Sequence, residues 1–219
     1  MAIVPMRHQS ERVPGKNYRL LSGKPLYHHV VAMLDSVPEI DTIVIDTDSK
    51  LIMDDAAAQF PGVQVLERPM HLRDGEIPMN DVLLNSLEQV DADVVIQTHS
   101  TNPFLKAETV ASALQLFRQK RHEIDSIFSV TRLQARLWDS QTQPLNHDPS
   151  NLLRTQDLQP LFIENSCFFI FTPDSLRREG NRIGRHPIMF EMAGVEAVDI
   201  DVEDDFELAS AIAERSTSS

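Results

Sequence analysis

The 219-residue chain lacks most features that mark secreted, membrane-spanning or nucleic-acid-binding proteins. Its one cysteine, Cys167, excludes an internal disulfide and suits a reducing compartment. No apolar run approaches the ~20 residues that a membrane helix needs, and the N-terminus does not resemble a signal peptide. Acidic residues outnumber basic ones by 33 to 20, which argues against sequence-independent nucleic-acid binding. We therefore expect a cytoplasmic protein with neither a membrane nor a nucleic acid as partner.

The composition and periodicity predict one α/β domain over residues 1–219. Apolar residues make up 42% of the chain, which is enough to bury a core, and no internal repeat is present. Short apolar segments alternate with segments of helical periodicity. The predicted strands after the first one are 42–46, 63–66, 93–97, 125–130, 164–171 and 198–202, with an extended or edge segment at 188–193. This alternation predicts a three-layer fold with a mainly parallel sheet.

A basic loop follows the first predicted strand, which begins at Ile3. From Met6 to Lys24 the chain has one acid, Glu11, and five bases, namely Arg7, Arg12, Lys16, Arg19 and Lys24. A cationic loop at the carboxyl end of a strand is where an α/β protein binds an anionic ligand. Gly15 would let backbone N–H groups approach a phosphate. The spacing matches neither common phosphate-loop pattern, so a phosphate loop and a solvated surface loop both stay open.

The opposite charge pattern occurs near the C-terminus. Between Val195 and Glu207 there are seven acids and no base. A strand at 198–202 would place Asp199 and Asp201 on one face, and two carboxylates suit Mg²⁺. The acids at 203–205 are predicted to lie in the first turn of the last helix, where negative charge is favourable. Paired surface acids are the alternative for Asp199 and Asp201.

Several other polar residues fit packing or capping better than chemistry. The segment 46–49 precedes a predicted helix and is expected to cap it, so Asp46 and Asp48 are expected to be caps rather than metal ligands. His28 and His29 are adjacent on a helix and point to different faces, which disfavours a shared metal. Cys167 lies in an apolar strand with no positive neighbours, so we expect a small hydrophobic residue rather than a nucleophile.

The opening segment I-V-P-M-R-H-Q-S-E-R-V-P-G-K-N-Y-R-L-L-S-G-K-P-L resembles the start of the acylneuraminate cytidylyltransferase family. The matching positions are Arg7, Ser10, Pro14, Lys16, Asn17 and the G-K-P-L at 23–26. The chain departs from the family at 6–9, where many members have small residues around the arginine. Related sugar nucleotidyltransferases share parts of this opening. The resemblance runs to the last helix and implies a Rossmann-like nucleotidyltransferase fold.

Later segments resemble the same family. The E-R-P at 67–69 matches a strand end near the nucleotide, and 97–105 resembles the motif L-Q-P-T-S-P with one extra residue. His99 lies there, at a position where members usually lack a histidine, so we expect a structural role. The strand at 164–171 resembles N-G-A-I-Y-I-F, with Asn165 in the matching place and Ser166 for glycine. The D-I-D at 199–201 matches the family's metal-binding pair.

The alternation of helices and strands breaks between residues 131 and 161. This segment is polar and rich in turns, yet it contains Trp138, Leu152 and Leu153. A long irregular segment in a compact domain is usually functional or an interaction arm. The resemblance implies a small β-rich arm at about 131–163 that crosses to a second subunit of a homodimer. It also implies that Arg154 reaches the acceptor, since a guanidinium binds carboxylate bidentately. Pairing with an acid of the arm, at 148 or 157, is the alternative.

The resemblance implies transfer of CMP from CTP to a sialic-acid-type (3-deoxy-2-ulosonic) sugar acid, with release of pyrophosphate. The implied catalytic residues are Arg7, Lys16, Asp199 and Asp201, the last two holding Mg²⁺. The implied nucleotide contacts are Arg7, Ser10, Lys16, Asn17 and Arg68, and the implied acceptor contacts are Gln97, Arg154, Gln156 and Asn165. No residue stands out as a general base. Two alternatives stay open: a cytidylyltransferase for another anionic acceptor, such as a different deoxy-ulosonate or a phosphonate, and a non-catalytic nucleotide-binding module.

Overall fold

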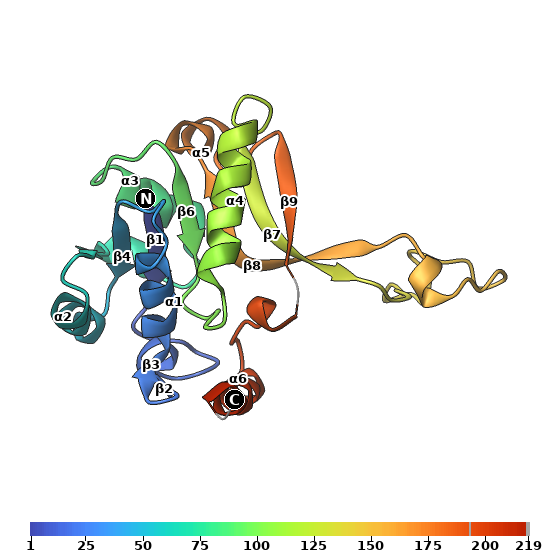
Figure 1. Cartoon of the computed structure of the whole chain (residues 1–219), viewed down its shortest axis with the longest axis horizontal. Coiled ribbons are helices and arrows are strands. Elements are labelled where there is room, and N and C mark those ends of the chain that lie inside the picture. The colour runs from blue at the N-terminus through green and yellow to red at the C-terminus, as the bar shows by residue number, and fades with distance from the viewer. Residues whose placement is uncertain (193, 218–219) are drawn as a thin grey trace.

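The computed structural model describes residues 1–192 and 194–217, which form a central sheet with helices on both faces (Figure 1). The strands lie in the order β5-β4-β1-β6-β8-β7-β9. Their bounds are β1 (Ala2–Met6), β4 (Ile43–Thr47), β5 (Gln64–Glu67), β6 (Val95–Thr98), β7 (Ser126–Leu133), β8 (Leu161–Phe171) and β9 (Pro187–Met192). All neighbouring pairs in this sheet are parallel except those that β8 makes with β6 and β7. The predicted fold with a mainly parallel sheet is confirmed.

Helices cover the two faces of the sheet in separate sets. The described helices are α1 (Leu26–Asp35), α2 (Lys50–Gln59), α3 (Met79–Leu87), α4 (Ala107–Lys120), α5 (Pro173–Glu179) and α6 (Glu203–Thr217). Apolar residues of α1, α2 and α4 share one core cluster, and those of α3 and α5 share a second cluster across the sheet. Because both faces are covered, β1 and β4 are buried along their whole length. Among the described helices, none is long and apolar enough to span a membrane.

Helix α6 packs against the basic loop instead of the sheet. Its Phe206 shares a third apolar cluster with Val13 and Leu21 on the N-terminal side and with Ile200 just before the helix. The Arg19 guanidinium donates two hydrogen bonds, of 2.5 and 2.6 Å, to the carboxylate of Glu203. This packing brings the acidic segment of the C-terminus against the basic loop of the N-terminus.

The predicted strand at 198–202 is wrong. These residues form no regular secondary structure and follow a 3₁₀ turn (Gly194–Ala197). The Ile200 N–H donates to the carbonyl of Thr101 (3.0 Å), and the Ile200 side chain is buried beside Val13. The alternation of apolar and acidic residues therefore comes from an irregular segment in which the side chain of Ile200 is buried. It does not come from pairing with a neighbouring strand.

The predicted caps are correct for α6 and correct in part for α2, where Ser49 of the predicted segment 46–49 is the cap and Asp46 and Asp48 are not. At the start of α6, Asp205 accepts the N–H groups of Asp201 and Val202 (2.8 and 2.9 Å), as expected for an acid in the first turn. At the start of α2, the cap is Ser49, whose hydroxyl accepts from the N–H of Ile52 (3.4 Å).

Asp46 and Asp48 have other partners. Asp46 is fully buried and accepts from Nε of Arg68 (2.5 Å) and from the hydroxyl of Ser86 (3.0 Å). Asp48 accepts the N–H of His8 (2.7 Å). Both carboxylates therefore connect neighbouring segments at the carboxyl edge of the sheet.

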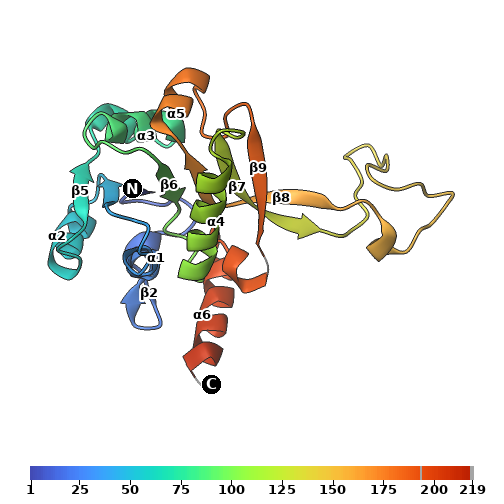
Figure 2. The same cartoon turned by 45° about the horizontal axis from the view of Figure 1, so that its top comes forward.

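Residues 131–163, here called the arm, leave the body of the domain. Strands β7 and β8 continue their antiparallel pairing past the sheet, from Thr131 with Ile163 to Leu133 with Leu161. Figures 1 and 2 both show this ribbon and the loop at its end extending to the right, clear of all helices. A second expected feature, an extended segment at 188–193, is the edge strand β9, and Ala193 lies outside the described residues.

The buried ion pair of Asp46 with Arg68 gives a stability prediction. Asp46→Asn keeps the shape but leaves a guanidinium that is 2% exposed without a counter-ion, which we expect to cost about 3–5 kcal/mol of unfolding free energy. Asp54→Asn removes an exposed pair with Lys50, for which we expect about 0.5 kcal/mol or less. Urea unfolding of both variants measures these losses of unfolding free energy. Equal losses would show that the Asp46 pair contributes no more than a surface pair.

Candidate functional site

The carboxyl ends of β1, β4, β5 and β6 meet at one edge of the sheet, and a cavity of about 910 Å³ lies over this edge. The basic loop after β1 forms much of its wall, together with residues that follow β4, β5 and β6. Open α/β sheets bind ligands at this edge. A second cavity of about 520 Å³ lies between the base of the arm and residues 194–201.

The cations of the basic loop meet the C-terminal acids directly. Lys16 is 9% exposed, and its Nζ donates to the carbonyl of Ile200 (2.5 Å) and lies 3.4 Å from Oδ1 of Asp201. Arg12 donates to the same carboxylate oxygen at 2.9 Å. Asp201 therefore neutralises two loop cations and holds them at the cavity wall.

Gly15 and Asn17 fix the shape of this loop. Gly15 has φ 67°, and a Cβ there would lie 2.7 Å from the ring of Tyr18, so the turn requires glycine. Asn17 is buried; its Nδ2 donates to the carbonyl of Arg7 (2.9 Å) and its Oδ1 accepts from the hydroxyl of Ser100 (2.7 Å). Asn17 thereby connects the loops that follow β1 and β6.

Three other residues predicted to contact the nucleotide line the large cavity. They differ in how far their side chains are exposed and free to reach a ligand. Arg7 is exposed, and its Nη1 lies 2.8 Å from where Gly75 would carry a Cβ. The Ser10 hydroxyl accepts from the N–H of Val13 (3.3 Å) and keeps its proton for another partner. Arg68 is buried against Asp46, so only part of its guanidinium can reach a ligand.

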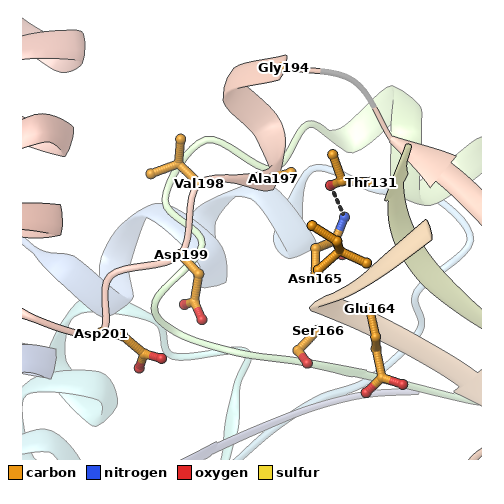
Figure 3. A pocket seen from close by; sticks show the side chains of 10 residues that line it. Thr131, Glu164, Asn165, Ser166, Gly194, Ala197, Val198, Asp199 and Asp201 are labelled. Carbon is orange, nitrogen blue, oxygen red and sulfur yellow. Dashed lines mark hydrogen bonds between the residues drawn. The ribbon is translucent and has the colours of Figure 1, made fainter. Parts of the chain in front are cut away.

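Asp199 and Asp201 lie where the two cavities meet, and Ser166 also lines both. Figure 3 shows the side chains of Asp199 and Asp201 coming from the same irregular segment, with Ser166 nearby on β8. Burial, followed by the neighbouring charge of Asp201, raises the pKa of Asp199, although an interaction with Thr101 opposes this. Oδ1 of Asp199 is buried and has no hydrogen-bond partner among the described residues. A free carboxylate oxygen beside a second carboxylate fits a divalent cation.

The strand β8 is irregular at this junction. Its pairing with β7 shifts register between Phe128 and Val130, and Ser166 adopts φ 57°. A positive φ is unusual for a serine, and bulges of this kind redirect side chains. The irregularity places Asn165 on the wall of the smaller cavity, where its Nδ2 donates to the hydroxyl of Thr131 (2.9 Å).

The other predicted acceptor contacts are not brought to the cavities of this chain. Gln97 is fully buried, and its Oε1 accepts from Nη1 of Arg182 (2.6 Å). Arg154 is exposed on the arm and donates to both carboxylate oxygens of Asp157 (2.7 and 3.1 Å), which is the alternative pairing. Gln156 is exposed beside it. The contact of Gln97 with Arg182 was not predicted, because only tertiary packing distinguishes Arg182 from its basic neighbours.

His99 and Cys167 are both held in their neutral forms. His99 lines the large cavity, and burial, with the charges of Arg182 and Lys16, lowers its pKa to about 4. Burial, with the carboxylates of Asp199 and Glu196, raises the pKa of Cys167 to about 12. Neither residue has the properties of an activated base or nucleophile near neutral pH.

Comparison with known proteins gives a consistent family assignment. A cytidylyltransferase family model matches residues 1–216. The N-acylneuraminate cytidylyltransferase of Oncorhynchus mykiss is 29% identical over 95% of this chain and 49% of its own length. The CMP-N,N'-diacetyllegionaminic acid synthase of Legionella pneumophila is 33% identical over 60% of this chain and 58% of its own. The chain thus spans about half the length of the curated relatives it matches.

Solved structures share the fold. A CMP:2-keto-3-deoxy-manno-octonic acid synthetase complexed with CTP superposes with a TM-score of 0.74, covering 98% of both chains at 16% identity. A 4-diphosphocytidyl-2C-methyl-D-erythritol synthase from Anaerococcus prevotii gives a TM-score of 0.66 at 12% identity. The predicted Rossmann-like nucleotidyltransferase fold is confirmed.

The burial of His99 gives a prediction that an NMR titration can check. We expect a midpoint of about 4 for its imidazole, against an ordinary value of 6.5. Because the unfolded chain then binds the proton more readily, folding stability should fall as the pH drops from 6.5 towards 4. A His99→Gln variant should lose part of this pH dependence. A titration midpoint near 6.5 would contradict a partly buried histidine whose surroundings keep it neutral.

Proposed function

The chain belongs to the cytidylyltransferase family, and we propose that it transfers CMP from CTP to a 3-deoxy-2-ulosonic sugar acid with release of pyrophosphate. The observation that carries this proposal is the meeting of two cavities at Asp199 and Asp201. In the proposed arrangement the large, cation-lined cavity binds CTP and the smaller one binds the acceptor. The α-phosphate and the attacking hydroxyl would then face each other at the acid pair.

The reaction needs little covalent chemistry from the protein. A hydroxyl oxygen of the acceptor attacks the α-phosphorus in line and forms one P–O bond while the bond to pyrophosphate breaks. Catalysis is then mainly positioning and neutralisation of charge. Lys16 and Arg12 carry the charge nearest to the acid pair, and Arg7 extends the positive surface along the cavity. We assign Arg7 and Lys16 to the triphosphate, and Ser10, Asn17 and Arg68 to holding the nucleotide and shaping its cavity.

Members of this family generally use a divalent metal, and we propose Mg²⁺ held by Asp199 and Asp201. The unpaired Oδ1 of Asp199 is a ready ligand. Among the described residues, no three His, Cys, Asp or Glu side chains gather in a group that could hold a metal. Mg²⁺ normally takes one or two carboxylates and completes its shell with phosphate oxygens and water. When bound, it would supply Lewis-acid stabilisation of the phosphoryl oxygens.

We further propose that the protein is a homodimer that associates through the arm. The arm exposes large apolar side chains, including Trp138 at 52%, Leu152 at 69% and Ile163 at 50%. Contiguous exposed apolar surface marks an interaction site. Arg154 and Gln156 lie on the same arm and line neither cavity of their own chain, so they could meet the acceptor of a second copy.

The function itself is tested by pyrophosphate release. We expect turnover with CTP and at least one of N-acylneuraminate, N,N'-diacetyllegionaminate and 3-deoxy-manno-octulosonate, and much weaker turnover with ATP or GTP. Omission of the acceptor should abolish release, because the hydroxyl is the nucleophile. CTP binding without turnover on any sugar acid would favour the non-catalytic module. Equal use of ATP or GTP would contradict the assignment of the nucleotide.

Asp199 and Asp201 give a prediction about how turnover depends on the metal concentration. Asp201→Asn is nearly isosteric and should leave the fold intact, yet turnover should fall about a hundredfold or more, since lost charge stabilisation costs on the order of 3 kcal/mol. Its Mg²⁺ titration should shift to higher metal concentration. Lys16→Ala should also reduce turnover but keep a near-normal metal midpoint.

Asp204→Asn is the matched control, because Asp204 lies in the first turn of α6 and lines neither cavity. It should retain parental activity and metal dependence. If Asp204→Asn loses activity and metal dependence while Asp201→Asn keeps both, the assignment of the metal to Asp199 and Asp201 is wrong.

The third prediction concerns association. Trp138→Ser combined with Leu152→Ser should convert the dimer to a monomer in analytical ultracentrifugation at micromolar concentration and should reduce turnover. Leu20→Ser alters another exposed apolar residue, 61% exposed in the hairpin formed by β2 (Leu20–Leu21) and β3 (Lys24–Pro25), away from the arm. It should leave the dimer unchanged. A parental protein that is monomeric and fully active at that concentration would contradict the role of the arm.

A further inference from the structure

Arg7 differs from the other lysine and arginine side chains that line the large cavity. Four of these lie within 4.0 Å of a carboxylate oxygen of the same chain, namely Arg12, Lys16, Arg68 and Arg73. Among residues 1–192 and 194–217, the Arg7 guanidinium has no carboxylate within that distance and donates no hydrogen bond. Its charge is therefore not compensated by an ion pair, and its planar fork is available for phosphate oxygens.

The Arg7 guanidinium lies against Gly75, in the loop between β5 and α3. A Cβ at Gly75 would lie 2.8 Å from Nη1 of Arg7, whereas non-bonded heavy atoms normally stay about 3.5 Å or more apart. Beyond the chain neighbours of Gly75, no other atom of the described residues lies within 4 Å of this position. A side chain at position 75 would therefore collide with Arg7 and with nothing else.

The backbone of Gly75 does not itself require glycine. Gly15 has φ 67°, but Gly75 is not among the glycines with a positive φ. It is exposed and lines the large cavity. Alanine is therefore compatible with the local backbone, and the Arg7 guanidinium is what the missing side chain leaves room for.

The backbones on both sides of this contact are held by hydrogen bonds. Nδ2 of Asn17 donates to the carbonyl of Arg7 (2.9 Å). In the opposite loop, Oδ1 of Asp74 accepts the N–H two residues further on (2.9 Å), and Nε of Arg73 donates to the backbone carbonyl five residues earlier (2.8 Å). A Cβ at Gly75 would therefore displace the guanidinium, which is the end of a long side chain, rather than either backbone.

We infer that Gly75 is a positioning residue for Arg7. Because it has no side chain, the guanidinium can lie between the loops that follow β1 and β5, on either side of β4, and bind the triphosphate there. The inference rests on the proposed function, which assigns Arg7 to the triphosphate. It adds a residue that has no chemical group of its own but determines where an uncompensated charge lies.

The test is a double-mutant cycle on CTP affinity, measured by calorimetry with the full chain. Arg7→Ala should weaken CTP binding about 10- to 100-fold, since it removes charge-assisted hydrogen bonds. Gly75→Ala should weaken it about 10-fold while the Tm stays near the parental value. In the double variant, affinity should be no lower than in Arg7→Ala alone, because the glycine acts only through the arginine. A merely structural role would multiply the two losses.

Gly62→Ala is the matched control. Gly62 is also exposed and has no positive φ, and a Cβ there would meet no atom of the described residues within 4 Å. It should keep parental CTP affinity and Tm.

Four outcomes overturn the inference: parental CTP affinity in Gly75→Ala, losses that multiply in the double variant, an equal loss in Gly62→Ala, or a Gly75→Ala protein that does not fold. A parental protein that binds CTP but turns over none of the three sugar acids refutes the proposed transfer and leaves this comparison of affinities intact. A parental protein that does not bind CTP refutes both.

Discussion

The contact between the loop after β1 and the segment before α6 is the interaction on which the site depends. Lys16 is almost buried, and its two polar partners, the Ile200 carbonyl and Asp201, come from the other end of the chain. Together the two partners supply the oxygen contacts that a lysine charge with little water around it needs, and losing both would be costly. The apolar cluster of Val13, Ile200 and Phe206 lies beneath the same contact. Packing and charge therefore hold the basic loop and the pair of Asp199 and Asp201 together.

The same contact explains why charges of opposite sign occur at the two ends of the chain. The loop cations need an anion to be stable in a partly closed cavity, and Asp201 supplies one from inside the protein. Asp199 is not engaged by the cations in this way, and burial raises its pKa. One carboxylate thus mainly balances the loop, while the other keeps an unpaired oxygen at the junction. The two acids are two residues apart, yet they have different electrostatic surroundings.

The fold and the charged segments that line the large cavity could be predicted from local sequence signals. Apolar runs of strand length, the basic loop and the acidic first turn of α6 are each contained in a few consecutive residues. The strand predicted at 198–202 was wrong because alternation does not reveal whether a neighbouring strand exists. Asp46 was misassigned as a cap because its partner, Arg68, is 22 residues away. The contacts of Arg182 with Phe169 and Gln97 could not be predicted, since they join three separate segments of the chain.

The two sides of the site also differ in what positions them. The large cavity lies over the ends of four parallel strands, whose spacing is fixed by regular hydrogen bonds. The smaller cavity, proposed for the acceptor, is lined by the irregular part of β8, the base of the arm and residues 194–201. Ser166 with φ 57° and the register shift opposite it show that this side departs from regular sheet geometry. Under the proposed function, changes there could alter which acceptor binds without disturbing the strands beneath the large cavity, so one transfer chemistry could serve different sugar acids on the same fold.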